Sequence, residues 1–213
     1  MLSRPSRPNR GVGRPRLIRA AAAVLGLALA ATLAACTQDP VAAQYLNGDN
    51  KGYIGADGLR VDEIKPADRG APVSFGGSLD NGGTFRSSEI AGDVVVVNFW
   101  YAACGPCRVE AKDLESVWQK YQDQGVSFVG INTYDQADTA KAFAEKYGVT
   151  YPSIIDVNTG EAKLSFAQVT PIQATPTTLV LDKQGRVAAR IVGQLEAPSI
   201  LETLIKDALA EKA

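Results

Sequence analysis

The sequence predicts an α/β fold in which a mixed central sheet is flanked by helices. The run Val94–Trp100 is β-branched and aromatic, which is typical of a strand buried on both faces. After it, apolar side chains recur at steps of three and four from Cys104 to Tyr121, which indicates an amphipathic helix. Strand-like and helix-like segments then alternate before a hairpin and a last helix, as they do when helices cover a sheet.

Each expected element follows from its own local pattern, beginning near Ala71. Apolar alternation marks the strands, a spacing of three to four marks the helices, and glycines mark the turns between them. The segment between Tyr134 and Asp156 adds one strand-helix unit to the core pattern. In chain order we expect a strand pair within 74–85, a strand over 94–100, a helix ending near Gly125, a strand over 126–132, a helix over 136–147 stopped by Gly148, a strand over 153–156, a helical turn over 162–166, strands over 177–181 and 186–192 joined by a turn, and a final helix through 200–209.

The first 35 residues have the pattern of a secretory signal. All six of their arginines lie at or before Arg19, no acidic residue is present, and an apolar run over 20–35 follows. The run is short and rich in alanine, which favours a cleaved signal over the alternative of an uncleaved membrane anchor. Leu33-Ala34-Ala35-Cys36 resembles the lipobox of bacterial lipoproteins. That resemblance implies a signal peptide over 1–35, lipid attachment at Cys36 and an extracytoplasmic location.

Residues 36–70 are predicted to be a lipid-anchored tether, because they contain turn pairs such as Asn47-Gly48 and scattered glycines and charges. A small hairpin around the Asp57-Gly58 turn is compatible with this segment, and the domain is expected over 71–213. Without the first 35 residues the chain has 16 basic and 23 acidic residues, a net charge of −7. This charge predicts no basic surface for nucleic acid.

The sequence Cys104-Gly105-Pro106-Cys107 places two thiols three residues apart at the start of the predicted helix. A helix N-terminus favours an anionic sulfur, because its backbone N–H groups are unpaired and its dipole is positive. Lowering a thiol pKa from about 8.5 to about 7 raises the thiolate fraction at neutral pH about tenfold. We expect Cys104, at the edge of the helix, to be the nucleophile and Cys107, one turn further in and more shielded, to be the resolving thiol.

Other uses of a cysteine pair are disfavoured. The chain has no histidine and only three cysteines, so a zinc site with four Cys or His ligands cannot be completed. Attachment of a c-type haem requires histidine where this chain has Arg108. A purely structural disulfide across so short a loop would constrain little chain entropy. We therefore expect a redox-active pair, with no cofactor and no metal.

From about Ala71 to Ala210 the chain resembles the TlpA/ResA-like thiol-disulfide oxidoreductases of the thioredoxin superfamily. The resemblance rests on Val-Val-Asn-Phe-Trp before the cysteine pair, Glu110 three residues after Cys107, the extra strand-helix unit, and Ala174-Thr175-Pro176-Thr177-Thr178 before a strand. It implies a thioredoxin-like fold with an N-terminal strand pair and a strand-helix insertion. It also implies a membrane-anchored protein.

The resemblance also implies substrate-binding residues. It makes Thr175-Pro176 a cis peptide beside the disulfide, where the backbone of Thr175 pairs with a substrate polypeptide, and it places Trp100, Gly105 and Pro106 on the same surface. The alternatives are a proline that merely begins a strand at Pro176 and an ordinary core aromatic at Trp100. Ala103 departs from the bulky residue that commonly precedes the first cysteine. The surface beside Cys104 is therefore expected to be open.

Glu110 is implied by the resemblance to take part in the thiol chemistry. Asn98 stands where thioredoxin itself has a buried aspartate, and an amide cannot carry the proton. A partly desolvated Glu110 would have a raised pKa and could accept the proton of Cys107. The alternative is a solvated helix glutamate, with water serving Cys107.

The function that the resemblance implies is reduction of protein disulfides, such as the haem-binding cysteines of apocytochrome c during cytochrome c maturation. Electrons would come from a CcdA-type or DsbD-type membrane thiol relay, on the outer face of the bacterial cytoplasmic membrane. An oxidase or isomerase of secreted proteins is the main alternative, because CxxC pairs span a wide range of potentials. A peroxiredoxin is disfavoured by residues such as Tyr101 ahead of Cys104, and a Sco-type copper carrier by the missing histidine.

Overall fold

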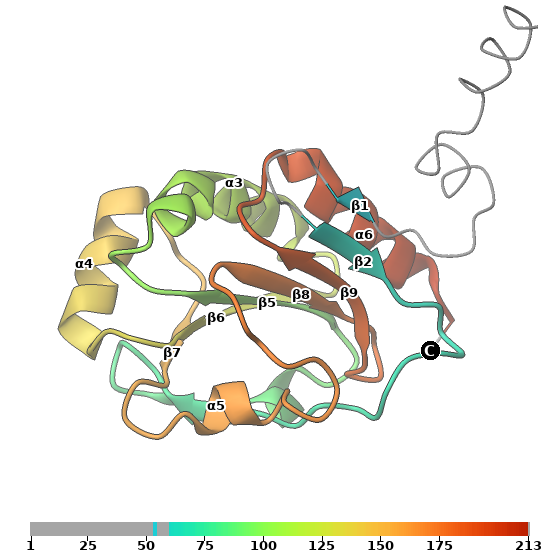
Figure 1. Cartoon of the computed structure of the whole chain (residues 1–213), viewed down its shortest axis with the longest axis horizontal. Helices are drawn as coiled ribbons and strands as arrows, with labels where there is room; N and C mark the ends of the chain where they lie inside the picture. The colour runs from blue at the N-terminus through green and yellow to red at the C-terminus, as the bar shows by residue number, and fades with distance from the viewer. Residues whose placement is uncertain (1–52, 55–59, 213) are drawn as a thin grey trace, which may run out of the picture. The chain divides into compact units, whose positions relative to one another are not determined.

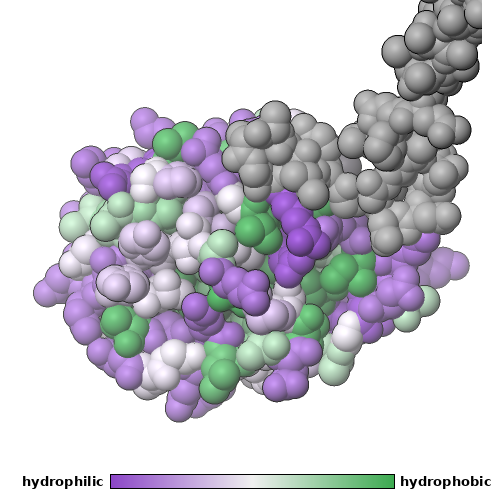
Figure 2. Space-filling view, in the orientation of Figure 1, coloured by the Kyte–Doolittle hydropathy of each residue, from purple (hydrophilic) through white to green (hydrophobic). Residues whose placement is uncertain are grey.

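The computed structural model describes residues 53–54 and 60–212 of the 213-residue chain. The predicted signal peptide, the lipid attachment at Cys36 and most of the predicted tether lie outside the described residues. Within the part described, no helix has the length and hydropathy that crossing a membrane requires. On the face seen in Figure 2, hydrophobic residues occur in small groups between hydrophilic ones.

A mixed sheet of seven strands forms the centre of the domain, which confirms the predicted α/β class (Figure 1). Its order is β1-β2-β9-β8-β5-β6-β7, and a separate pair, β3-β4, is the predicted N-terminal strand pair. β5 runs parallel to β6 and β6 to β7, whereas β8, β9 and β2 join by antiparallel pairing. The strands are β1 (Tyr53–Ile54), β2 (Arg60–Glu63), β3 (Gly76–Ser78), β4 (Thr84–Arg86), β5 (Val94–Trp100), β6 (Val126–Asn132), β7 (Ser153–Ile155), β8 (Thr177–Leu181) and β9 (Val187–Val192).

The two faces of the sheet are covered by different elements. α3 (Gly105–Tyr121) and α6 (Pro198–Ala210) lie over one face, while α5 (Glu161–Leu164) and the β3-β4 pair lie over the other (Figure 1). α4 (Ala137–Tyr147) follows β6, and with β7 it forms the predicted insertion. A 3₁₀ turn, η2 (Ser87–Ile90), which the sequence patterns did not predict, precedes β5.

The alternation of side chains along β5 decides what faces α3. Every residue of β5 is buried, so the strand has a core on each side. Val94 and Val96 pack in the cluster that contains α3 and α6, whereas Val95, Val97 and Phe99 pack in the cluster on the opposite face. With a period of two, Asn98 and Trp100 therefore point to the α3 side.

The predicted helix boundaries are confirmed except at the end of α3. α3 ends at Tyr121, not near Gly125, because the Gln124 N–H bonds to the Tyr121 carbonyl and Gly125 turns the chain into β6 with a φ of 72°. α4 ends as predicted at Gly148, which takes the left-handed conformation. These turns fix where β6 and the insertion begin.

The domain begins earlier than the predicted boundary at Ala71. β2 pairs with β9 and extends the main sheet, and β1 pairs with β2 as the small hairpin. The Arg69 side chain is almost fully buried and bonds to both Asp182 (2.9 Å) and the Glu211 carboxylate. The expected tether is thus wrong for residues 60–70, because their short apolar stretches conceal a strand and an ion pair that only the folded partners complete.

A chain that starts at Ala71 should be less stable than one that starts at Asn50. It loses β2 and the Arg69 guanidinium that donates to buried Asp182, which keeps Arg186 as a partner, and a hydrogen bond to a charged group contributes about 1.5 to 3 kcal/mol. Urea denaturation of the two chains measures the difference, and Arg69→Ala in the longer chain isolates the ion pair. Equal unfolding midpoints would show that residues 50–70 are a mere tether.

Candidate active site

The loop between β5 and α3 brings the two cysteines to the N-terminus of the helix. Cys104 is the N-cap of α3 and forms a disulfide with Cys107. The Cys104 sulfur also accepts a hydrogen bond from the Cys107 N–H at 3.1 Å, which satisfies one of the unpaired donors of the first turn. Pro106 occupies the first turn, where no N–H is needed. The predicted position of the pair at the helix start is confirmed.

Burial does not distinguish the two cysteines as predicted. Cys104 is 3% exposed and Cys107 is 2% exposed, whereas Gly105 and Pro106 between them are exposed. Both sulfurs lie in a cluster with Trp100 and with residues of α4, which covers Cys104 as well. What separates the two cysteines is position, because Cys104 ends the loop and Cys107 belongs to the helix.

The loop before Cys104 is held from two sides. The Ala102 N–H donates to the Asp135 carboxylate at 2.6 Å, from the segment between β6 and α4. Arg108 donates to the Ala103 carbonyl at 2.6 Å and to the Cys104 carbonyl at 3.3 Å. The guanidinium therefore fixes a positive charge beside the backbone of Cys104, which favours a thiolate there. Sequence patterns missed Asp135, because its partner is a backbone group 33 residues away.

Trp100 lies beneath the disulfide and is buried. Its ring packs against Phe143 of α4, with centroids 4.4 Å apart, and its indole N–H points to the Ser153 hydroxyl at 3.3 Å. Gly130 makes this arrangement possible, because a Cβ there would clash with both the indole nitrogen and the Ser153 hydroxyl. Trp100 thus packs in the same cluster as the two cysteines, and its contact with a substrate stays a prediction.

Glu110 lies one helical turn after Cys107 and is buried, with 1% of its surface exposed. One carboxylate oxygen accepts from the Asn98 amide at 3.0 Å, and the other accepts from the Leu195 N–H at 2.7 Å. The Asn98 amide also donates to the Thr178 hydroxyl at 3.0 Å, which orients it towards Glu110. The alternative of a solvated helix glutamate is therefore wrong.

Burial raises the pKa of Glu110 from 4.5 to about 7. Loss of solvation is the largest cause, the hydrogen bonds from Leu195 and Asn98 lower the pKa, and the charge of Asp113 raises it slightly. The carboxyl group is thus poised to change its protonation near neutral pH. A carboxyl with this property on the same helix face as Cys107 can hold or release the proton of a thiol.

Thr175 and Pro176 precede β8 and are joined by a cis peptide bond, as predicted. The register pairs Thr177 with Phe99, so this segment lies at the same end of the sheet as Trp100 and the cysteine loop. Pro176 is buried and Thr175 is partly exposed. The structure therefore brings the predicted site residues to one end of the sheet, with Thr175, Gly105 and Pro106 at the surface.

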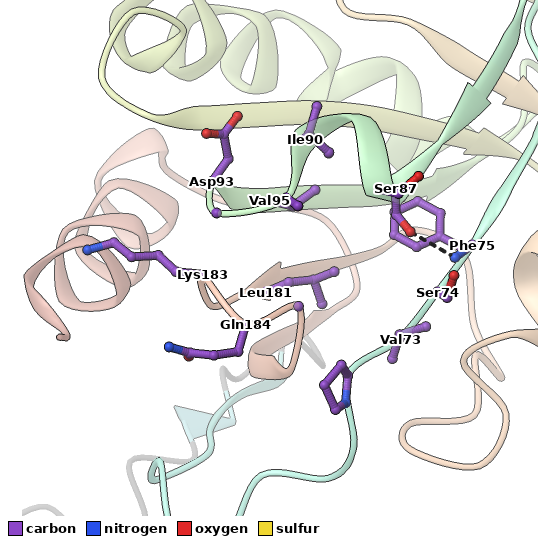
Figure 3. Close-up of a pocket in the computed structure, with 15 residues that line it drawn as sticks. Val73, Ser74, Phe75, Ser87, Ile90, Asp93, Val95, Leu181, Lys183 and Gln184 are labelled. Atoms are coloured by element: carbon purple, nitrogen blue, oxygen red, sulfur yellow. Dashed lines mark hydrogen bonds between the residues drawn. The ribbon is translucent and has the colours of Figure 1, made fainter. Parts of the chain in front are cut away.

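A cavity of the described residues lies elsewhere. It has a volume of about 200 Å³ and is lined by residues around β3, η2 and the β8-β9 turn (Figure 3). Its lining includes Asp93, at the start of β5, whereas the cysteines follow the other end of that strand. Two of its polar side chains are engaged, since Lys183 donates to carbonyls near the C-terminus and Ser87 accepts from the Phe75 N–H. Within the described part of the chain, no cluster of potential metal ligands occurs.

Comparisons with known proteins agree with this site. Residues 70–190 match the AhpC/TSA family. The chain is 32% identical over 119 residues to the thiol-disulfide oxidoreductase ResA of Geobacillus thermodenitrificans (strain NG80-2), which covers 56% of this chain and 66% of that protein. The chain spans about three fifths of the length of the curated relatives it matches.

Two solved structures share the fold. A thiol:disulfide interchange protein of the thioredoxin family from Chlorobium tepidum TLS is 30% identical, with a TM-score of 0.62 over 68% of this chain and 100% of its own. A secreted thiol-disulfide isomerase from Corynebacterium glutamicum is 29% identical, with a TM-score of 0.62 over 75% of this chain and 99% of its own. The predicted thioredoxin-like fold is confirmed.

Glu110→Gln should remove a pH dependence of stability. Because the pKa of Glu110 is higher in the folded protein, its contribution to stability is full below pH about 4.5 and is lost as pH rises through about 7. The free energy of unfolding of the oxidised wild type should therefore fall relative to that of the variant by about 3 kcal/mol in total. Urea denaturation between pH 4 and pH 8 measures this, and parallel curves would show that Glu110 keeps an ordinary pKa.

Proposed function

The chain belongs to the AhpC/TSA family, and we propose that it is a thiol-disulfide oxidoreductase that exchanges disulfides with other proteins through Cys104 and Cys107. The observation that carries this proposal is the disulfide at the N-terminus of α3, with a buried carboxyl of raised pKa one turn further along the helix. The names of the relatives support the same activity. No step of the reaction requires a cofactor.

The first step joins the enzyme to its substrate. In the reduced enzyme, the Cys104 thiolate attacks one sulfur of a substrate disulfide, so that a Cys104-substrate bond forms and the substrate S–S bond breaks. The departing substrate sulfur takes up a proton as it leaves. The helix N-terminus and the charge of Arg108 stabilise the thiolate that begins this step.

The second step releases the substrate. Cys107 gives its proton to the Glu110 carboxylate and attacks the Cys104 sulfur, which forms the observed disulfide and frees the second substrate thiol. Two electrons have then passed from the enzyme dithiol to the substrate disulfide. A second dithiol protein must return them, and a CcdA-type or DsbD-type membrane relay fits this requirement chemically.

The direction we propose is reduction, with unfolded polypeptides such as apocytochrome c among the substrates during cytochrome c maturation. The Gly-Pro pair between the cysteines favours a reduction potential at the reducing end of the range that CxxC pairs span. A second candidate is isomerisation of secreted protein disulfides, which the likeness to the Corynebacterium glutamicum isomerase supports. Both directions use the same two sulfurs.

We place the domain outside the cytoplasm, anchored to the outer face of the membrane through Cys36. The arginine-rich and apolar leader supports export, and Leu33-Ala34-Ala35-Cys36 supports lipid attachment. A secreted protein among the relatives agrees with an extracytoplasmic site of action. Such a position would bring the disulfide within reach of both exported substrates and a membrane relay.

Two cysteine variants test the proposed activity. Cys104→Ser should abolish reduction of a model protein disulfide, because the attacking thiolate is lost. Cys107→Ser should instead accumulate a mixed disulfide between Cys104 and the substrate, which non-reducing gels and intact mass detect. An adduct on Cys104→Ser and none on Cys107→Ser would overturn the assigned order of attack.

Cys36→Ala should abolish lipid attachment and alter the retention of the protein by membranes of the cells that make it. This follows because the lipobox pattern places the lipid on the thiol of Cys36. Intact-mass measurement of the membrane fraction checks this, with Ala35→Gly as a control that keeps the cysteine and a small preceding residue. Wild-type protein without diacylglyceryl on Cys36 would contradict the anchor.

A further inference from the structure

An exposed aromatic side chain lies next to the loop that carries Cys104. Among the described residues, three large hydrophobic side chains are exposed: Tyr134 (76%), Val109 (60%) and Leu164 (69%). The ring of Tyr134 lies against that of Tyr101, three residues before Cys104. Val109 belongs to α3, and Leu164 belongs to α5, on the opposite face of the sheet (Figure 1). Tyr134 is therefore the exposed side chain that the structure ties to the cysteine loop.

The backbone of Tyr134 is fixed by hydrogen bonds, and its ring contacts one neighbouring ring. Its centroid is 5.5 Å from that of Tyr101, with the ring planes inclined at 40°. The buried Asn132 side chain accepts from the Tyr134 and Asp135 N–H groups at 3.0 and 2.7 Å. Asp135 in turn accepts from Ala102 in the cysteine loop. This turn is thus tied directly to the loop that carries Cys104, and the exposed ring needs little ordering to bind a ligand.

Ala103 leaves space next to this pair of rings. It lies between Tyr101 and Cys104, is exposed, and contributes only a methyl group. Arg108 holds its carbonyl, so the loop cannot easily close over the tyrosines. Because residue 103 is an alanine and not a bulky residue, the aromatic rings beside Cys104 are left accessible.

A polypeptide that bonds to Cys104 must cross this surface. Cys104 is almost buried, so a substrate sulfur reaches it only when the residues flanking that sulfur lie against the neighbours of Cys104. Successive residues of an extended chain advance about 3.3 to 3.6 Å each. A side chain one or two positions from the substrate cysteine therefore lies close to the loop that carries Cys104. Aromatic rings bind apolar and aromatic side chains well in such a position.

We propose that the paired rings of Tyr101 and Tyr134 form a subsite for an apolar or aromatic side chain next to the reacting cysteine of a polypeptide substrate. The pair then selects unfolded or extended polypeptides with such a flanking residue over small disulfides. This inference rests on the proposed function and names its substrate class. Tyr134 is a specificity residue in this scheme, since it contacts the substrate and not the reacting sulfurs.

Kinetics with paired substrates test the subsite. Two peptide disulfides that differ only in having phenylalanine or glycine beside the cysteine are compared, with glutathione disulfide as a substrate that lacks a flanking apolar side chain. Tyr134→Ala should lower kcat/KM for the phenylalanine peptide about two- to tenfold, the effect expected from losing one aromatic contact, mainly through KM. Rates with the glycine peptide and glutathione disulfide should stay unchanged. Tyr134→Phe, which keeps the aromatic ring, should retain the preference for the phenylalanine peptide.

Leu164→Ala is the matched control, because it removes an equally exposed apolar side chain on the opposite face. It should leave all three rates unchanged. Equal loss on all three substrates with Tyr134→Ala, or no change in the preference for phenylalanine, would overturn the subsite. Absence of reaction with all three disulfides in the wild type would instead count against the proposed oxidoreductase itself, so the two failures are distinguishable.

Discussion

The buried carboxyl of Glu110 is the constraint on which the arrangement of the site depends. It joins three segments, because it belongs to α3, accepts from Asn98 of the preceding strand β5, and accepts from the backbone of Leu195, 85 residues away and just before α6. An amide at position 98 is required by this geometry, since an aspartate there would set a second carboxylate against Glu110. The chain therefore carries this buried carboxyl on the helix instead of the strand.

A group of this kind destabilises the fold when it ionises, and the surrounding structure offsets that cost. All seven residues of β5 are buried, and apolar clusters cover both faces of the sheet. On the cysteine side, Trp100 and Phe143 pack beneath the disulfide, while Asp135 and Arg108 hold the loop by its backbone. The insertion containing α4 thus contributes to the site directly, because Phe143 packs against Trp100 and the Asp135 carboxylate, just before α4, reaches the loop.

The sequence predicted the fold and the reacting pair, but not the contacts that tune them. Strands and helices could be predicted because their periodicity is a local feature of the sequence. Cys104 and Cys107 could be predicted because the spacing between them is also local. Arg69 with Asp182, and Ala102 with Asp135, are contacts between distant segments, so no local pattern reports them. The equal burial of the two cysteines was missed for the same reason, since residues of α4 join their cluster. Glu110 was identified through a family resemblance, and its burial became clear only from the strand and loop that surround it.

The most direct test of the central claim is the rate of reduction of the Cys104–Cys107 disulfide across pH 5 to 9, followed by stopped-flow fluorescence in the wild type and in Glu110→Gln. Here Cys107 leaves as a thiolate, and a protonated Glu110 can supply its proton. We predict a fall of about 10² in the rate for the variant near neutral pH, the usual scale of general acid-base assistance, with loss of the inflection near pH 7. Superimposable profiles would contradict the account and would mean that water serves Cys107 directly.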